Sequence, residues 1–266
     1  MSEHKSVVVV SFGTTYKETC EKTIGAIEHD IRSQFSDRRF YRAWTSGFIQ
    51  KKILERDGVN ILSPEEALQL AMKENCRDIL IQPTHLLAGG EYERMTDRLK
   101  PLAGMFSNLH IGRPLLEKEE DIIEMAVTFS TIFADAKEDE VVAFMGHGSD
   151  SLKLPVYELL NQAFLDLGKK NFVTGTVEFA PGIKLVLNRI RERRPKKVYL
   201  SPLLVVAGDH ANNDMAGDKP DSWKNQISAE GPQVECIMKG IGEYPEIRNM
   251  YIRRALEALC AHGDHN

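Results

Sequence analysis

Short apolar runs alternate with longer amphipathic stretches along this chain, and the alternation predicts a parallel α/β fold. In the first half, Val7–Val10 has the continuous β-branched character of a buried strand, and residues 19–35 then carry isoleucines at helical spacing. Further strands are expected at Arg39–Trp44 and Asp78–Gln82. Between them, residues 63–74 open with Ser-Pro-Glu-Glu, which is the capping box of a helix.

The second half of the chain repeats this order of elements. Strands are expected at Val141–Met145, Phe172–Val177 and Lys197–Leu200. Helices are expected between them, at Pro155–Leu167 and Ile183–Arg193. Repeated strand–helix–strand units place their strands parallel, with right-handed crossovers.

The two halves also match in detail. Residues 78–91 align with residues 197–210 without a gap, and residues 9–13 parallel residues 144–148. Strand–Pro–apolar–Gly is a common pattern, so coincidence is the alternative. Duplication is favoured because two separate segments agree in the same order. The fold class expected is therefore α/β, with two similar doubly wound parallel-sheet halves.

The boundary between the halves is expected near the acidic stretch Glu117–Asp121 or in the helix that follows it. We assign residues 1–125 to an N-terminal α/β domain and residues 126–266 to a C-terminal α/β domain. A second possibility is that the last helix packs back on the first domain.

Composition excludes several classes of function. The 266 residues have a formal net charge of -5, which argues against general affinity for nucleic acid. No apolar run is long enough to span a bilayer, and Val7–Val10 is too short for a signal-peptide core, so we expect no membrane partner and a cytoplasmic protein.

The four cysteines lie far apart and form no CxxC pair, which argues against disulfides and a structural zinc site. The tail at residues 261–266 contains two histidines, and a frayed end is favoured over a metal site there.

Polar side chains follow each predicted strand of the second half, where open parallel sheets bind their ligands. These residues are His147, Glu178 and His210. Two imidazoles and a carboxylate suit Co²⁺, Fe²⁺, Ni²⁺ or Zn²⁺. A histidine in a loop is more often a hydrogen-bonded surface residue, and Glu178 alone resembles an ordinary exposed acid, so the pattern by itself leaves both interpretations open.

The corresponding places in the first half hold Phe12, approximately Thr45, and Glu91. No P-loop, HExxH or GxSxG motif is present, and Gly146-His147-Gly148 is not a dinucleotide loop. Nothing in the sequence indicates ATP, NAD or flavin.

Eight segments of the chain carry a distinctive pattern: Val9–Tyr16, Thr19–Lys22, Arg42–Gly47, Gly90–Glu93, Phe144–Gly148, Leu203–Ala216, Asp221–Lys224 and Gly240–Glu243. These segments closely resemble the anaerobic-pathway sirohydrochlorin cobaltochelatases, which are class II tetrapyrrole chelatases, and the resemblance covers nearly the whole chain. The stretch Leu203–Ala216 is the most distinctive of them.

The resemblance implies a two-domain chelatase fold with the tetrapyrrole in the interdomain cleft. It implies that the metal ligands are His147, Glu178 and His210, and that the catalytic residues are His147, His210 and Glu91. The implied reaction is insertion of Co²⁺, as substrate metal, into sirohydrochlorin or its oxidised precursor-2 form. No ATP is needed, and the product serves cobalamin biosynthesis.

The substrate is a polycarboxylated macrocycle, so cations at its rim and aromatic side chains at its face are expected contacts. The aromatic candidates are Phe12 and Trp44, with core packing as the alternative. The cationic candidates are Lys17, Arg42, Arg94 and Lys224, with ordinary surface solvation as the alternative.

Two other classes of function stay open on the residues alone. Fe²⁺ or Ni²⁺ in place of Co²⁺ would make the protein a siroheme or haem ferrochelatase or a nickel chelatase. A non-enzymatic carrier of haem or metal would use the same histidines as axial ligands. A homo-oligomer is compatible with every one of these.

Overall fold

The computed structural model describes residues 4–149 and 152–261, and it divides into two compact units. The first unit comprises the described residues up to Leu115 and those from Gly242 onward, and the second comprises Leu116–Ile241. The histidines of the C-terminal tail, His262 and His265, lie outside the described residues.

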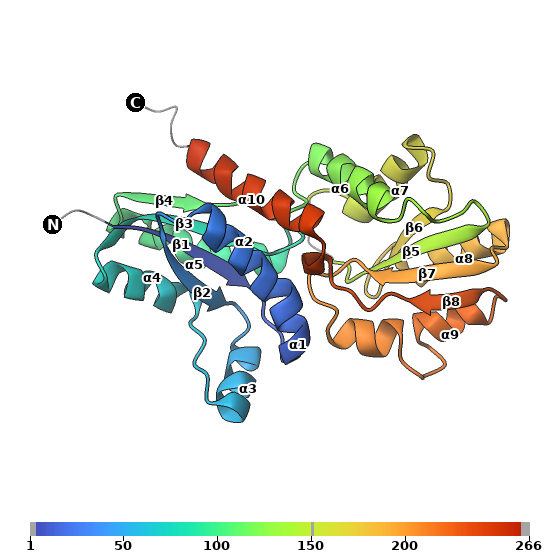
Figure 1. The fold of residues 1–266 in the computed structure, drawn as a ribbon, viewed down its shortest axis with the longest axis horizontal. Helices are drawn as coiled ribbons and strands as arrows, with labels where there is room; N and C mark the ends of the chain where they lie inside the picture. The colour runs from blue at the N-terminus through green and yellow to red at the C-terminus, as the bar shows by residue number, and fades with distance from the viewer. Residues whose placement is uncertain (1–3, 150–151, 262–266) are drawn as a thin grey trace. The chain divides into compact units, whose positions relative to one another are not determined.

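This division differs from the boundary expected after residue 125. That boundary falls inside helix α6 (Glu119–Ile132), which packs on α7 (Val156–Asp166) and belongs wholly to the second unit. The last helix, α10 (Pro245–Cys260), packs on α2 (Ala26–Gln34) and on the third strand of the first unit. It therefore completes the first unit from the far end of the chain (Figure 1).

The first unit contains a four-stranded sheet in the order β2-β1-β3-β4, and every neighbouring pair is parallel. Its strands are β1 (His4–Ser11), β2 (Arg39–Trp44), β3 (Cys76–Pro83) and β4 (Asn108–Ile111). The helices along its chain are α1 (Lys17–Cys20), a π-helical turn at Glu21–Gly25, α2, α3 (Gly47–Asp57), α4 (Pro64–Lys73), α5 (Gly90–Leu99), a 3-10 segment at Lys100–Met105 and α10.

Helices cover both faces of this sheet, which is why the valine run of β1 is apolar throughout. Val8 and Val10 share a core cluster with residues of α4 and α5. Val7 and Val9 are equally buried and point to the opposite face, because side chains alternate along a strand. The predicted capping box is confirmed: Ser63 accepts a hydrogen bond from the Glu66 N–H, and the Glu66 carboxylate accepts one from the Ser63 N–H.

The second unit repeats this architecture, with a parallel sheet in the order β6-β5-β7-β8. Its strands are β5 (Glu140–Gly146), β6 (Phe172–Thr176), β7 (Lys197–Pro202) and β8 (Gln233–Cys236). Its remaining helices are α8 (Gly182–Arg193), a π-helical turn at Ala211–Met215 and α9 (Trp223–Ser228). A 3-10 turn at Ile241–Glu243 begins at the last residue of this unit.

Both faces of the second sheet are also covered. Phe144 of β5 stacks on Phe164 of α7 and lies 4.5 Å, between ring centroids, from Phe129 of α6. The opposite face packs on α8, α9 and the turn at Ala211–Met215.

The predicted duplication is confirmed by the identical strand orders, in which β1 to β4 correspond to β5 to β8. The correspondence extends to the backbone just beyond the first strand of each unit. Gly13 and Gly148 occupy matching positions and both have a positive φ, +100° and +92° respectively. Among the described residues, no helix has the length and apolar character needed to cross a membrane.

Candidate active site

His147 lies directly after β5, at the carboxyl edge of the second sheet. The pairing between β5 and β6 continues past the strands, because the Glu178 N–H donates to the His147 carbonyl over 2.8 Å. The half-buried ring has its Nδ1 3.0 Å from the Gly148 carbonyl oxygen. A carbonyl can only accept, so Nδ1 carries the proton and Nε2 has its lone pair available.

The turn that holds His147 requires glycine at position 148. Its backbone is left-handed, and a Cβ placed there would lie 1.8 Å from the Glu178 carbonyl oxygen. The Gly148 N–H donates to the hydroxyl of Tyr157 over 3.1 Å. Burial raises the pKa of Tyr157 to about 12, so this hydroxyl remains neutral at physiological pH.

His210 begins a helical turn, whereas the sequence was interpreted as a loop at this point. Ala211 and Met215 of the π-helical turn are fully buried in the core of the second unit and fix its orientation. His210 is left on the outer side, where its Nδ1 donates to the Asp214 carboxylate over 2.6 Å. Its Nε2 is therefore also the atom with an available lone pair.

The two imidazoles meet edge to face. Their ring centroids are 4.7 Å apart and their planes make an angle of 85°. Among the described residues, neither Nε2 has a hydrogen-bond partner. Two imidazoles from separate elements thus lie together with both Nδ1 atoms committed to oxygen, which is the arrangement of metal-ligating histidines and their supporting acceptors.

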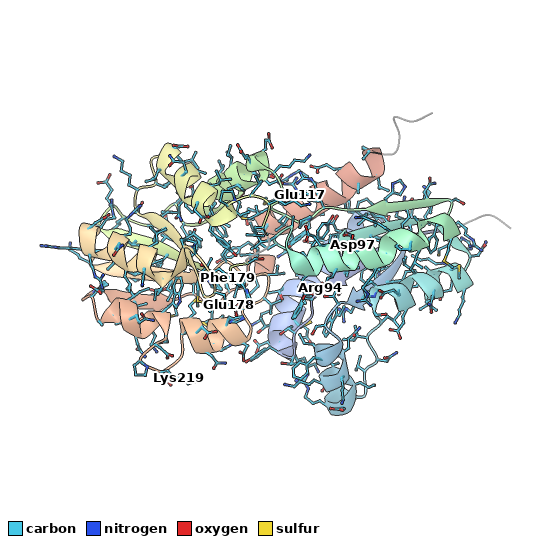
Figure 2. All side chains as sticks on the ribbon, turned by 180° about the vertical axis from the view of Figure 1, so that it is seen from behind. Arg94, Asp97, Glu117, Glu178, Phe179 and Lys219 are labelled. Carbon is cyan, nitrogen blue, oxygen red and sulfur yellow. The ribbon has the colours of Figure 1, made fainter. Side chains whose placement is uncertain are left out.

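The backbone of Glu178 lies beside that of His147. The turn that carries it is fixed by Thr176, whose hydroxyl donates to the Phe179 carbonyl and accepts from the Gly182 N–H, each over 3.0 Å. Glu178 and Phe179 are both exposed and adjacent in Figure 2. Within residues 4–149 and 152–261, no three His, Cys, Asp or Glu side chains gather closely enough to hold a metal ion. The structure therefore unites the two histidines, and the third predicted ligand is not gathered with them.

A hollow of about 440 Å³ adjoins the His210 turn in the second unit. Its walls include Val177, Phe179, Trp223 and the carboxylate-bearing Asp214 that holds His210. Apolar surface with a few polar groups is typical of small-molecule sites.

In the first unit, Glu91 stands in the first turn of α5 and forms an ion pair with Arg94, which is exposed (Figure 2). Phe12 is 48% exposed and stays a proposed substrate contact. Trp44 is only 2% exposed and packs against Ile53 and Ile61. The suggestion that Trp44 stacks on substrate is therefore wrong, and core packing explains this residue.

The cationic candidates for substrate contact differ in their surroundings. Arg42 is bound by two of its nitrogens to the buried Glu28 carboxylate, which gives it a role in the fold, and its partly exposed side chain stays a candidate substrate contact. Lys224 lies in the second unit, 3.6 Å from the Asp218 carboxylate and within 3.4 Å of the Ala216 carbonyl, beside the His210 turn. Lys17 is exposed at the start of α1.

One polar residue with unusual surroundings, His85, was missed from the sequence. It follows β3, and both ring nitrogens are shielded from solvent with no hydrogen-bond partner among the described residues. Burial lowers the pKa of His85 to about 4, and the Glu91 carboxylate opposes that shift. No motif marks the position, because its isolation depends on the folded surroundings.

The fold belongs to the chelatase-like class. SirB from Bacillus subtilis, solved with Fe³⁺, has the same fold, with a TM-score of 0.67 at 16% identity and 99% of each chain covered. CbiX, described as the terminal enzyme of siroheme biosynthesis in denitrifying bacteria, has a TM-score of 0.55 at 16% identity over 96% of this chain and 99% of its own.

Sequence comparison identifies the family within that class. Residues 5–260 match the family model described as cobalt chelatase (CbiK). The sirohydrochlorin cobaltochelatase of Salmonella typhimurium is 36% identical over 96% of both chains. The sirohydrochlorin cobaltochelatase CbiKC of Nitratidesulfovibrio vulgaris is 27% identical over 98% of this chain and 92% of its own. The chain belongs to the cobalt chelatase family, and cobalt is its substrate metal.

The Asp214 carboxylate should matter to metal handling through His210. In Asp214→Asn, Nδ1 of His210 loses its charged acceptor, so the ring is held less firmly and its Nε2 is less basic. We expect kcat/KM for the metal to fall about 10- to 100-fold, measured in steady-state insertion assays. Asp37→Asn removes the same charge from an exposed site in the first unit and should change kcat/KM by less than about twofold. Equal losses in both variants would contradict this role.

The Gly148 turn can be tested against a second left-handed glycine. Alanine at either Gly148 or Gly168 introduces a strain of about 1–2 kcal/mol, because both residues have positive φ. A Cβ at Gly168 meets open space, whereas one at Gly148 meets the Glu178 carbonyl. Gly148→Ala should therefore lower the free energy of unfolding by roughly 1–3 kcal/mol more than Gly168→Ala, measured by urea titration. Equal losses would show that the close approach of the Glu178 carbonyl does not matter.

The buried His85 predicts a specific dependence of stability on pH. Its pKa is about 4 in the folded protein and about 6.5 in the unfolded chain, so the unfolded chain binds more protons between these values. Stability should fall as the pH drops below about 6.5, by roughly 2 kcal/mol between pH 7.5 and pH 5 from this group alone. Comparing urea unfolding of the wild type and His85→Leu at both pH values isolates the effect. An unchanged pH dependence in the variant would refute it.

Proposed function

We propose that the protein inserts Co²⁺ into sirohydrochlorin without ATP, as a step of cobalamin biosynthesis. The observation that carries this proposal is the pair of imidazoles, His147 and His210, with ring centroids 4.7 Å apart and both Nε2 lone pairs available. The proposed identity of the tetrapyrrole substrate is based on the relatives in Salmonella typhimurium and Nitratidesulfovibrio vulgaris, which are described as sirohydrochlorin cobaltochelatases.

In this proposal the two Nε2 atoms hold the cobalt ion and the Glu178 carboxylate supplies the third protein ligand. The exposed Glu178 side chain reaches the ion by rotation about its own bonds, since its backbone is fixed beside His147. Coordination positions remain open for the nitrogens of the macrocycle. Imidazole and carboxylate ligands also accept Fe²⁺, Ni²⁺ and Zn²⁺, so we expect these ions to be inserted in vitro.

Insertion must release two protons, because a divalent ion replaces two pyrrole N–H groups of the macrocycle. As cobalt moves to the pyrrole nitrogens, each Nε2 atom loses its metal and regains the capacity to accept a proton. Two imidazoles can thus take up the two protons that leave. We propose Glu91 as a further base, and Phe12, Arg94 and Lys224 as substrate contacts.

The decisive test is insertion with purified components. Protein, sirohydrochlorin and Co²⁺ are mixed without nucleotide, and the change in the absorption spectrum on insertion is followed. We expect many turnovers per site in the wild type and a loss of at least about 100-fold in kcat for His147→Ala and for His210→Ala. Both variants should remain folded, because the rings are half-buried at the edge of the sheet and not in the core.

His29→Ala is the matched control, since His29 is exposed on α2 in the first unit. Its kcat should equal that of the wild type. Stoichiometric binding of the tetrapyrrole without turnover would identify a carrier and overturn the proposal. Wild-type turnover in either histidine variant would overturn the assignment of the metal ligands.

A further inference from the structure

His85 is held in place by the backbone on both sides of it. The Thr84 N–H donates to the Val10 carbonyl, and the Thr84 hydroxyl donates to Ser11, each over 2.8 Å. The His85 carbonyl itself accepts from the Leu115 N–H over 3.1 Å. The loop therefore cannot turn to expose the ring without breaking these bonds, and the imidazole stays where its nitrogens are shielded and unpaired.

An imidazole is not needed at this position for folding. Residues 78–91 and 197–210 match without a gap, and the position in the second unit that corresponds to His85 holds Leu204. The same β-strand and the same following turn are thus built around an apolar side chain. Buried polar groups without partners are unfavourable, so the presence of histidine in the first unit requires a reason other than the fold.

The environment of the ring indicates its partner. Tyr92, in the first turn of α5, contacts the His85 ring edge to face at a centroid distance of 6.2 Å. Glu91 immediately precedes Tyr92, and its carboxylate acts electrostatically on the imidazole. In the structure this carboxylate is paired with the exposed guanidinium of Arg94 (Figure 2). Glu91 therefore has two possible partners: the exposed, charged guanidinium of Arg94 and the shielded, unpaired ring of His85.

We propose that His85 is a positioning residue for Glu91: one ring N–H donates to the Glu91 carboxylate once a carboxylate of the substrate has bound Arg94. The ring then fixes the orientation of Glu91 while Glu91 accepts a pyrrole proton. This inference rests on the proposed role of Glu91 as a base.

A buried, neutral imidazole suits this task better than a cation. Burial lowers the pKa of His85 to about 4, so the ring donates a hydrogen bond without delivering a proton of its own. A neighbouring ammonium or guanidinium would stabilise the charged carboxylate and make Glu91 a weaker base. When the Glu91 carboxylate leaves Arg94 and accepts a hydrogen bond from His85, its capacity to take up a proton therefore increases. This change of partner takes place when the substrate binds, just before the proton must be accepted.

Leucine and glutamine at position 85 separate positioning from packing. His85→Leu removes the donor and also removes an unsatisfied buried group, so its thermal midpoint should equal or exceed that of the wild type. Its kcat for cobalt insertion should fall at least about tenfold, with KM for sirohydrochlorin within about twofold. His85→Gln restores a donor and should recover kcat to within about threefold of the wild type.

A double-mutant cycle with Glu91→Gln links the two residues. If His85 acts through Glu91, adding His85→Leu to Glu91→Gln should cause no further loss of kcat. Multiplied losses in the double variant would overturn the inference while leaving Glu91 as a base. Wild-type kcat in His85→Leu, or a loss of folded protein in that variant, would also overturn it. Wild-type kcat in Glu91→Gln would instead remove the proposed role of Glu91 itself.

Discussion

Two hydrogen bonds at Nδ1 determine what this protein presents to a metal. A neutral imidazole has one donor and one acceptor nitrogen, so the atom that donates decides which atom can bind an ion. The Gly148 carbonyl occupies Nδ1 of His147, and the Asp214 carboxylate occupies Nδ1 of His210. Each of these acceptors is fixed in turn, the first by a left-handed glycine and the second by a helical turn anchored in the core through Ala211 and Met215.

The duplicated scaffold shows how one turn serves two purposes. Gly13 and Gly148 adopt the same left-handed conformation after the first strand of their units, and a Cβ at either would collide with a neighbour. The neighbour of Gly13 is the ring of Trp44, whereas that of Gly148 is the carbonyl of Glu178. Close approach thus packs a core in the first unit and places a polar segment beside His147 in the second. Duplication supplied the geometry, and substitution at the strand ends supplied the chemistry.

Sequence alone predicted the features that depend on local pattern. The strands, the capping box at Ser63 and the positions of His147 and His210 after strand ends follow from periodicity and from the parallel topology. The edge strands β4 and β8 were not predicted, because they have four residues each and so short a segment shows no hydrophobic periodicity. The surroundings of Arg42 and Trp44 could not be predicted, because their partners, Glu28 and the cluster with Ile53, become neighbours only on folding. His85 was missed for the same reason, since nothing in its sequence neighbours reveals that both nitrogens are unpaired.

The proposed ligand set, two imidazoles and one exposed carboxylate, suits an enzyme that must release its ion. A structural zinc site closes four ligands around the metal and retains it. Such tight binding does not help a chelatase. It lowers the free energy of the enzyme-bound ion, and the barrier to transferring that ion to the macrocycle rises by the same amount. In the proposed role, two imidazoles held by their Nδ1 hydrogen bonds and the exposed Glu178 carboxylate would bind the ion in a defined direction and leave it weakly enough coordinated to pass on. Fixing the nitrogens and leaving the carboxylate exposed therefore favours transfer over storage.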